Sequence, residues 1–109
     1  MMHQPDNWVM IKVINTHETF YKILAGWSGG YLDGSSWRMN SGVVDVKEEG
    51  DYFLFLGSTG SIYKCHKESY GLRMNNAYIW EQLKERYPDK VEMLDENNDW
   101  KSFNWVELK

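Results

Sequence analysis

The hydrophobic pattern of this 109-residue chain changes its period once, and that change limits the folds open to it. Across residues 8–66, short apolar and alternating segments are separated by polar or glycine-containing turns, which is typical of antiparallel strands. The apolar residues then recur at helical spacing as Ile79, Leu83 and Tyr87, and Pro88 ends the segment. A helix with one apolar face must pack on another element, and the largest apolar surface available is a sheet face. The sequence therefore predicts an α+β fold, a twisted antiparallel sheet packed by one helix in the C-terminal half.

The first part of the chain predicts five or six strands. Trp8–Ile14 and Thr19–Ala25 are rich in β-branched residues and separated by a polar turn, so they fit an opening hairpin. Tyr52–Leu56 is an unbroken apolar run, which indicates a strand covered on both faces. The other candidates in this region are Ser36–Asn40, Val43–Lys47 and Ser61–His66. All of these segments are compatible with antiparallel pairing in one sheet.

Local signals also place the start of the helix and the segments after it. Asn75 or Asn76 can cap the N-terminus of the helix. Lys90–Leu94 fits a short strand. The tail from Trp100 to Leu108 either adds an edge strand or packs only through its tryptophans.

Length and composition favour one folded domain spanning residues 1–109. The net charge of −4 argues against a general nucleic-acid coat, which would carry a basic excess. Cys65 is the only cysteine, so no intrachain disulfide can form and a reducing cytoplasm is the expected location. The start of the chain lacks a signal-peptide pattern, and no run reaches the ~18 apolar residues of a membrane span. We therefore expect a cytoplasmic protein that does not enter a membrane.

Catalytic and metal sites lack their usual spacing. Cys65 and His66 are adjacent in a predicted strand, so their side chains point to opposite faces and cannot form a dyad without a bulge. A buried structural cysteine is the interpretation that this pattern favours. His3 and His17, taken with Cys65 and His66, show no zinc-site spacing. We therefore expect no enzymatic activity, no catalytic residue, no metal and no cofactor.

The segment from Gly26 to Gly42 has the composition of a recognition surface, because it places three large aromatic residues and an arginine among glycines and small polar residues. If Ser36–Asn40 is a strand with Trp37 and Met39 facing the core, Arg38 and Asn40 face outward. The next hairpin and the connection to the helix add further aromatic and cationic residues. The predicted contact residues are Trp27, Tyr31, Arg38, Asn40, Lys64, Tyr70 and Arg73.

Three stretches, Ser36–Gly42, Gly60–His66 and Tyr70–Leu72, resemble segments of small accessory proteins of large tailed bacteriophages. The resemblance carries no catalytic residues. It implies a binding protein that inhibits or sequesters a bacterial host factor, such as a defence protein, in the host cell cytoplasm.

Several hypotheses about the partner stay open. The partner is either a host protein or nucleoprotein complex, or a small phosphorylated nucleotide held by Arg38, Lys64 and Arg73. A small hydrolase or transferase that uses Cys65 is an alternative, and it requires a partly exposed thiol. Another is a virion assembly subunit whose interface is formed by exposed Trp100, Phe103 and Trp105. An unpaired edge strand or the aromatic tail also leaves a homodimer open.

Overall fold

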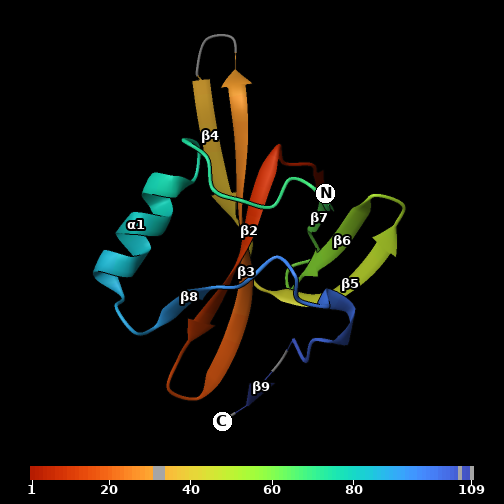
Figure 1. Cartoon of the computed structure of the whole chain (residues 1–109). Coiled ribbons are helices and arrows are strands. Elements are labelled where there is room, and N and C mark those ends of the chain that lie inside the picture. The colour runs from red at the N-terminus through yellow and green to blue at the C-terminus, as the bar shows by residue number, and fades with distance from the viewer. Residues whose placement is uncertain (31–33, 106, 109) are drawn as a thin grey trace.

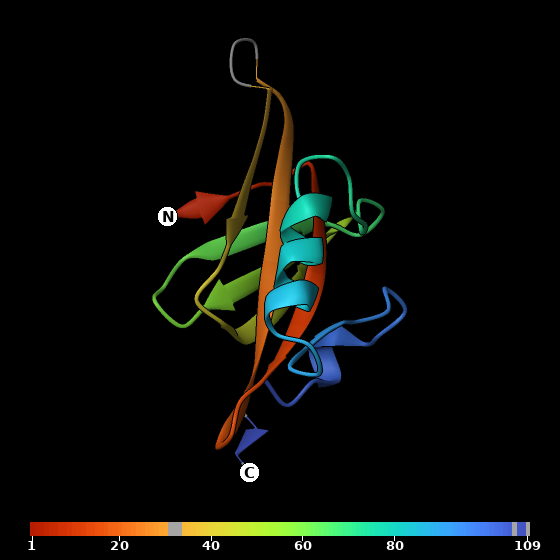
Figure 2. The same ribbon diagram turned by 90° about the vertical axis from the view of Figure 1, so that its left-hand side faces the viewer.

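The computed structural model describes residues 1–30, 34–105 and 107–108, and it arranges the chain in three layers (Figure 1). Helix α1 (Ala77–Arg86) packs on one face of a central five-stranded sheet, and a four-stranded sheet packs on the other face (Figure 2). In this part of the chain no helix is long and apolar enough to cross a membrane. The remaining elements are β1 (Met2–His3), β2 (Asn7–Ile14), β3 (Glu18–Gly30), β4 (Gly34–Met39), β5 (Val43–Glu49), β6 (Tyr52–Gly57), β7 (Ile62–His66), β8 (Val91–Met93), the short 3₁₀ helix η1 (Trp100–Ser102) and β9 (Glu107–Leu108).

The central sheet has the strand order β4-β3-β2-β8, and β9 pairs with the first two residues of β3, Glu18 and Thr19. The second sheet has the order β1-β7-β6-β5. Within both sheets the pairs are antiparallel except β1 with β7, which run parallel. The opening hairpin is confirmed as β2 and β3, with Val9 opposite Leu24, and the short strand after the helix is confirmed as β8.

The α+β class and the helix in the C-terminal half are confirmed, but the prediction of a single sheet is wrong. The chain leaves the central sheet after β4 and turns at Gly42, whose φ of 139° is a conformation that favours glycine. β5 then pairs with β6 instead of β4 and begins the second sheet. Two sheets are needed because β2 is apolar on both faces, so each face requires its own covering layer.

Two apolar clusters fill the spaces between the layers. The larger lies between the sheets, where Trp8 and Met10 of β2 pack with Phe55 and Cys65 of the second sheet. The smaller lies under the helix, where Val9, Ile11 and Leu24 pack with Ile79 and Trp80. Alternate residues of β2 therefore enter different clusters, as the pleat of a strand requires.

The aromatic tail belongs to the core. Trp100 and Trp105 are 2% and 8% exposed, and their rings stack with centroids 6.5 Å apart. Phe103 packs against both rings, at 5.1 Å from Trp100 and 5.0 Å from Trp105. These two tryptophans are buried, so the exposed interface that the virion-subunit alternative requires is not present at their side chains.

One face of β6 is open. Phe53 and Phe55 point towards the core, whereas Leu56 is 37% exposed on the opposite face. The prediction that Tyr52–Leu56 is covered on both faces is therefore wrong. The second sheet is an outer layer, and its outward face meets solvent.

Buried asparagines join the start of the helix to the central sheet. The side-chain amide of Asn7 on β2 donates to the side-chain oxygens of Asn75 (3.1 Å) and Asn76 (3.2 Å) and to the carbonyl of Gly71 (3.0 Å). Asn75 donates to Asn7 Oδ1 at 2.6 Å and to Ser28 Oγ at 3.0 Å. All three asparagines are at most 1% exposed, and their side-chain amides bond to one another, to the backbone and to the Ser28 hydroxyl. We call Asn7, Asn75 and Asn76 the asparagine network.

Asn76 occupies the N-cap position of α1, as expected, but its side chain does not cap the helix. Its Oδ1 accepts from the Arg73 N–H at 2.9 Å, and its Nδ2 donates to the Leu24 carbonyl at 3.2 Å. The side chain thus fixes the connection before the helix to β3. Asn75 lies directly on Gly26 of β3, where an added Cβ would come within 2.1 Å of Asn75 Oδ1.

Glu48 of β5 stands opposite Phe53, on the core-facing side of the second sheet, and joins β5 to two other segments. Its Oε1 accepts from Lys101 of η1 at 2.6 Å, and its Oε2 pairs with Lys67 just after β7. Hydrogen bonds from Lys101 and then Lys67 lower the pKa of Glu48 from 4.5 to about 2. A carboxyl whose pKa is lower in the folded state stabilises that state while it is charged.

Asn76→Asp tests the asparagine network. The carboxylate lacks the Nδ2 donor, so it places unpaired negative charge beside the Leu24 carbonyl, and we expect the free energy of unfolding to fall by about 3 kcal/mol. Urea denaturation measures the change. Asn97→Asp, at an exposed position, is the matched control and should change stability by less than about 0.5 kcal/mol. Equal effects of the two substitutions would contradict the role given to the network.

The Glu48 ion pairs predict a specific loss of stability in acid. The folded pKa lies below the unfolded one, so the contribution of Glu48 is complete above about pH 4.5 and is lost as the pH falls towards 2. We expect Glu48→Gln to lower the melting temperature at pH 7 and to have little effect near pH 2. Glu49→Gln, on the same strand, is the control, and thermal unfolding monitored by circular dichroism at both pH values is the measurement. A Glu48→Gln effect that is the same at both pH values would contradict the pairing.

Candidate binding groove

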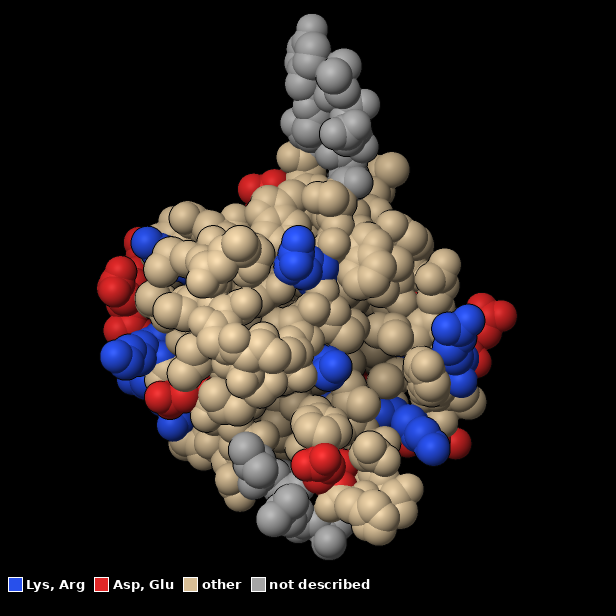
Figure 3. Space-filling model, turned by 180° about the vertical axis from the view of Figure 1, so that it is seen from behind, with Lys and Arg blue, Asp and Glu red and all other residues tan. Residues whose placement is uncertain are grey.

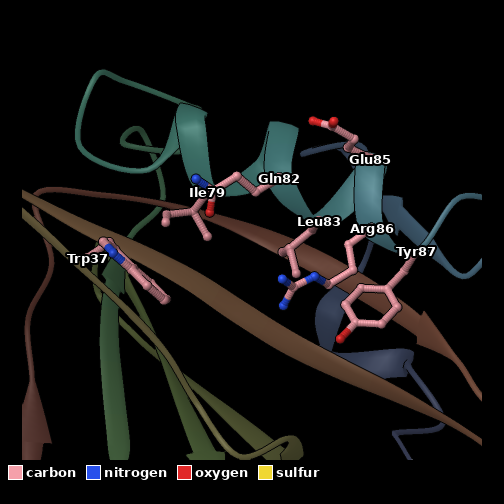
Figure 4. Close-up of a pocket in the computed structure, with 7 residues that line it drawn as sticks. All are labelled: Trp37, Ile79, Gln82, Leu83, Glu85, Arg86 and Tyr87. Atoms are coloured by element: carbon pink, nitrogen blue, oxygen red, sulfur yellow. The ribbon is translucent and has the colours of Figure 1, made fainter.

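A hollow lies between helix α1 and strand β4 (Figure 4). It has a volume of about 660 Å³, and its lining side chains come from one strand residue and one side of the helix. Trp37 forms one wall, and Leu83, Arg86 and Tyr87 project from the helix and its C-cap towards the sheet (Figure 4). We call this hollow the Trp37 groove. Its remaining lining residues are Ile79, Gln82 and Glu85.

The register of β4 explains why Trp37 lines this groove. Trp37 stands opposite Gly26 of β3, and Arg38 stands opposite Ala25. Ala25 belongs to the cluster between the sheets, so Arg38 shares that face and Trp37 lies on the face that α1 covers. Gly26 carries no side chain that could pack against the indole from the neighbouring strand. Trp37 is consequently 42% exposed, and the prediction that it faces the core is wrong.

Residues of α1 form the wall of the groove opposite Trp37, and helical spacing brings them to one side of the helix. Ile79, Leu83 and Arg86 follow one another at intervals of four and three residues, so they lie on the same side of α1. Ile79 is buried against the sheet, whereas Arg86 lies at the last turn, beyond the apolar cluster. Glu85 points away from the sheet and Arg86 towards it (Figure 4).

Arg86 differs in its ion pairing from the lysine beside it on the helix. Lys84, two residues earlier on α1, pairs with Glu81 at 2.9 Å and lies 5.5 Å from the centre of the Trp80 ring. No ion pair within residues 1–30, 34–105 and 107–108 joins Arg86 to a carboxylate. The groove therefore combines an exposed indole with a guanidinium available to an anionic or planar group.

Two of the predicted contact residues lie close together outside this groove. Trp27 donates from its indole N–H to the Gln4 carbonyl at 3.0 Å, and its ring lies 6.3 Å from that of His3. Arg38 is exposed, and its positive charge influences the same histidine, His3. Burial is the main cause that lowers the pKa of His3, and the positive charge of Arg38 lowers it further. Trp27 and Arg38 thus flank His3 near the N-terminus.

Asn40 is turned inward. It is 5% exposed, its N–H donates to the Ile23 carbonyl at 3.2 Å, and its Oδ1 accepts from the Ile23 N–H at 2.9 Å. The prediction that Asn40 faces outward is wrong because β4 ends at Met39 and the next residue folds its amide back onto β3. Tyr31, also predicted as a contact residue, lies outside the described residues.

The remaining predicted residues are spread over the molecule. Lys64 of β7 lies 4.6 Å from the centre of the Tyr52 ring, in the second sheet. Arg73 is exposed in the connection that precedes α1. Lys64 and Arg38 belong to different sheets, and Lys64 points away from the core cluster that contains its neighbours Tyr63 and Cys65.

Tyr70, also predicted as a contact residue, has a side chain that is held by contacts within the protein. Its hydroxyl donates to the Leu94 carbonyl at 2.5 Å and accepts from the Met10 N–H at 3.0 Å, and its ring meets that of Trp8 edge-on at 4.7 Å. Burial is the main cause that raises the pKa of Tyr70, to about 12. The side chain thus fixes the segment before the helix against β2. It also borders a smaller hollow of about 370 Å³, beside Asp95.

Sequence reasoning missed the helix side of the groove. The helical spacing predicts that Ile79, Leu83 and Tyr87 pack on the sheet, as Ile79 does, and it indicates no role for Arg86. The signal that could have shown the groove is the mismatch between a ten-residue helix and a thirteen-residue strand, because a short helix leaves part of a long strand uncovered. That argument also requires the position of the helix along the strand, which depends on long-range contacts such as those of the asparagine network and Tyr70.

Cys65 does not have the surroundings of a reactive thiol. It is 0% exposed in the cluster between the sheets, and burial raises its pKa well above the ordinary value. The Cys65 hydrolase or transferase alternative requires a partly exposed thiol and gains no support from this geometry. Among the described residues, no group of three or more His, Cys, Asp or Glu side chains could hold a metal ion.

Burial of Cys65 predicts slow thiol chemistry. We expect Ellman's reagent to modify the native protein at least about a hundredfold more slowly than the protein unfolded in urea, because the thiol reacts only after the core opens. Ser36→Cys adds a thiol at an exposed position and is the control, in which one of the two thiols should react at once. Rapid modification of Cys65 in the native protein would contradict its buried position.

The chain matches no family model, no curated protein and no solved structure. What it does is therefore inferred from its own residues and their geometry.

Proposed function

We propose that this chain is a non-enzymatic binding protein whose partner docks in the Trp37 groove. The observation that carries this proposal is the pairing, across one hollow, of a 42% exposed tryptophan with an arginine that forms no ion pair with another described residue. A tryptophan exposes this much surface to water only at a cost that burial against a partner removes. Tryptophan, tyrosine and arginine are also the residue types that dominate binding energy at protein interfaces.

A bacterial protein is the partner class that we propose. The resemblance to bacteriophage accessory proteins favours a host factor, which binding would inhibit or sequester. A phosphorylated nucleotide has weaker support, because the three cations considered for it do not share one surface: Arg38 is on the central sheet, Lys64 on the second sheet and Arg73 in a connection. A groove of about 660 Å³ is large enough for several side chains of a protein segment.

Trp37→Ala and Arg86→Ala test this proposal. Immobilised wild-type protein is expected to capture a protein from bacterial lysate, and each substitution should weaken the isolated complex about tenfold or more, measured by titration calorimetry. The folded state should keep its stability, since both side chains are outside the buried clusters.

Tyr78→Ala and Lys84→Ala are matched controls on the same helix. Tyr78 is 50% exposed and is not a lining residue of the groove, and Lys84 is the basic residue two positions before Arg86. Both variants should bind as the wild type does. Capture that is equally strong in all four variants, or absent from the wild type, would remove the basis of the proposal.

A further inference from the structure

Strand β4 forms an open edge of the central sheet. Among the described residues it pairs with β3 and with no other strand. Two backbone bonds show which of its groups point away from β3: the Asn40 N–H donates to Ile23, and the Gly26 carbonyl accepts from Asp6 on the β2 side. Hydrogen-bonding directions alternate along an antiparallel strand. The backbone N–H and carbonyl groups of Trp37 and Met39 therefore point outward, at the free edge.

This edge carries few of the features that usually protect one. Natural edge strands are guarded by lysines, prolines or bulges. β4 contains no proline, and its one charged residue is Arg38. The register shift in its pairing with β3 lies between the Trp27–Ser36 and Gly30–Gly34 pairs, so it leaves the pairing of residues 36–39 regular. Figure 2 shows β4 on the side of β3 that lies at the back in Figure 1. The centre of the back face shows Lys or Arg side chains and few Asp or Glu side chains (Figure 3).

We infer that the partner segment is an extended acidic peptide that adds to β4 as a further strand, an inference that rests on the proposed function. Pairing supplies main-chain hydrogen bonds from Trp37 and Met39, and alternate side chains of the peptide enter the Trp37 groove. A strand laid beside β4 presents one set of side chains to Arg86 on the helix face and the other set to Arg38 on the opposite face.

Charge selects the acidic peptide over a second copy of this chain. Neither Arg38 nor Arg86 forms an ion pair with a carboxylate of the described residues. Carboxylates on a peptide would pair with both guanidinium groups. A second copy joined edge to edge would instead bring its own Arg38 and Arg86 to the same surface, and like charges oppose that contact.

A displayed library of random ten-residue peptides, selected on the wild-type protein, tests this inference. We expect the selected peptides to be rich in Asp and Glu, to alternate these with apolar residues and to lack proline in their centre. Met39→Pro removes the outward N–H at an edge position that tolerates proline, and it should weaken a selected peptide about tenfold or more, measured by fluorescence anisotropy. Met39→Ala is the matched control, because it removes the side chain and keeps the N–H, and it should bind within about threefold of the wild type.

A second measurement on the wild type does not depend on how Met39→Pro folds. Amide hydrogen exchange at Trp37 and Met39 should slow when the selected peptide binds, because only then do these N–H groups acquire partners. Exchange at Arg38, whose N–H points towards β3, should change much less.

Three results would overturn strand addition. These are selected peptides without acidic residues, equal binding by Met39→Pro and Met39→Ala with unchanged exchange at Trp37 and Met39, and a dimer in light scattering that Met39→Pro abolishes. In each case the proposed function still stands if capture of the bacterial protein depends on Trp37 and Arg86. Loss of that dependence would instead remove the proposed function itself.

Discussion

The asparagine network determines where the helix lies, and the Trp37 groove depends on that position. An apolar helix face packs on an apolar sheet in many orientations, because hydrophobic contact has little directionality. Hydrogen bonds between buried amides have strict geometry, and leaving one unmade costs free energy. Asn7 sits on β2, while Asn75 and Asn76 precede α1, so satisfying all three fixes the start of the helix over β2 and β3. The apolar cluster supplies stability, and the asparagines supply the register.

The need to cover both apolar faces of β2 explains the second sheet and the burial of the aromatic tail. β2 presents tryptophan and methionine on one face and valine and isoleucine on the other, so it can only be a middle layer. The helix covers the second of these faces. The first requires a larger cover, which the second sheet and the rings of Trp100 and Trp105 provide together. Glu48 pairs with Lys101 of the 3₁₀ helix that contains Trp100 and also with Lys67 after β7, so it links these two segments.

Patterns that depend on neighbouring residues were predicted well, and those that depend on distant pairing were not. The alternation of residues 8–25 and the spacing of Ile79 and Leu83 are local, so the opening hairpin and the helix follow from them. The division into two sheets arises because β5 pairs with β6 and not with β4. The residue alternation within β4 and β5 does not indicate this pairing. The exposure of Trp37 and the inward turn of Asn40 were missed for the same reason. They follow from the register against Gly26 and Ile23, which lie on another strand.

Gly26 has a consequence for how a sequence with this fold can change. Its missing side chain is the space that Asn75 occupies, and a Cβ there would come within 2.1 Å of the Asn75 oxygen. Any larger residue at position 26 therefore requires a smaller one at 75, and that smaller residue would give up the bonds to Asn7 and Ser28. The two positions lie far apart in the sequence, yet a substitution at one restricts which residues the other can hold. Related chains that keep this helix placement should carry glycine and asparagine together or change both.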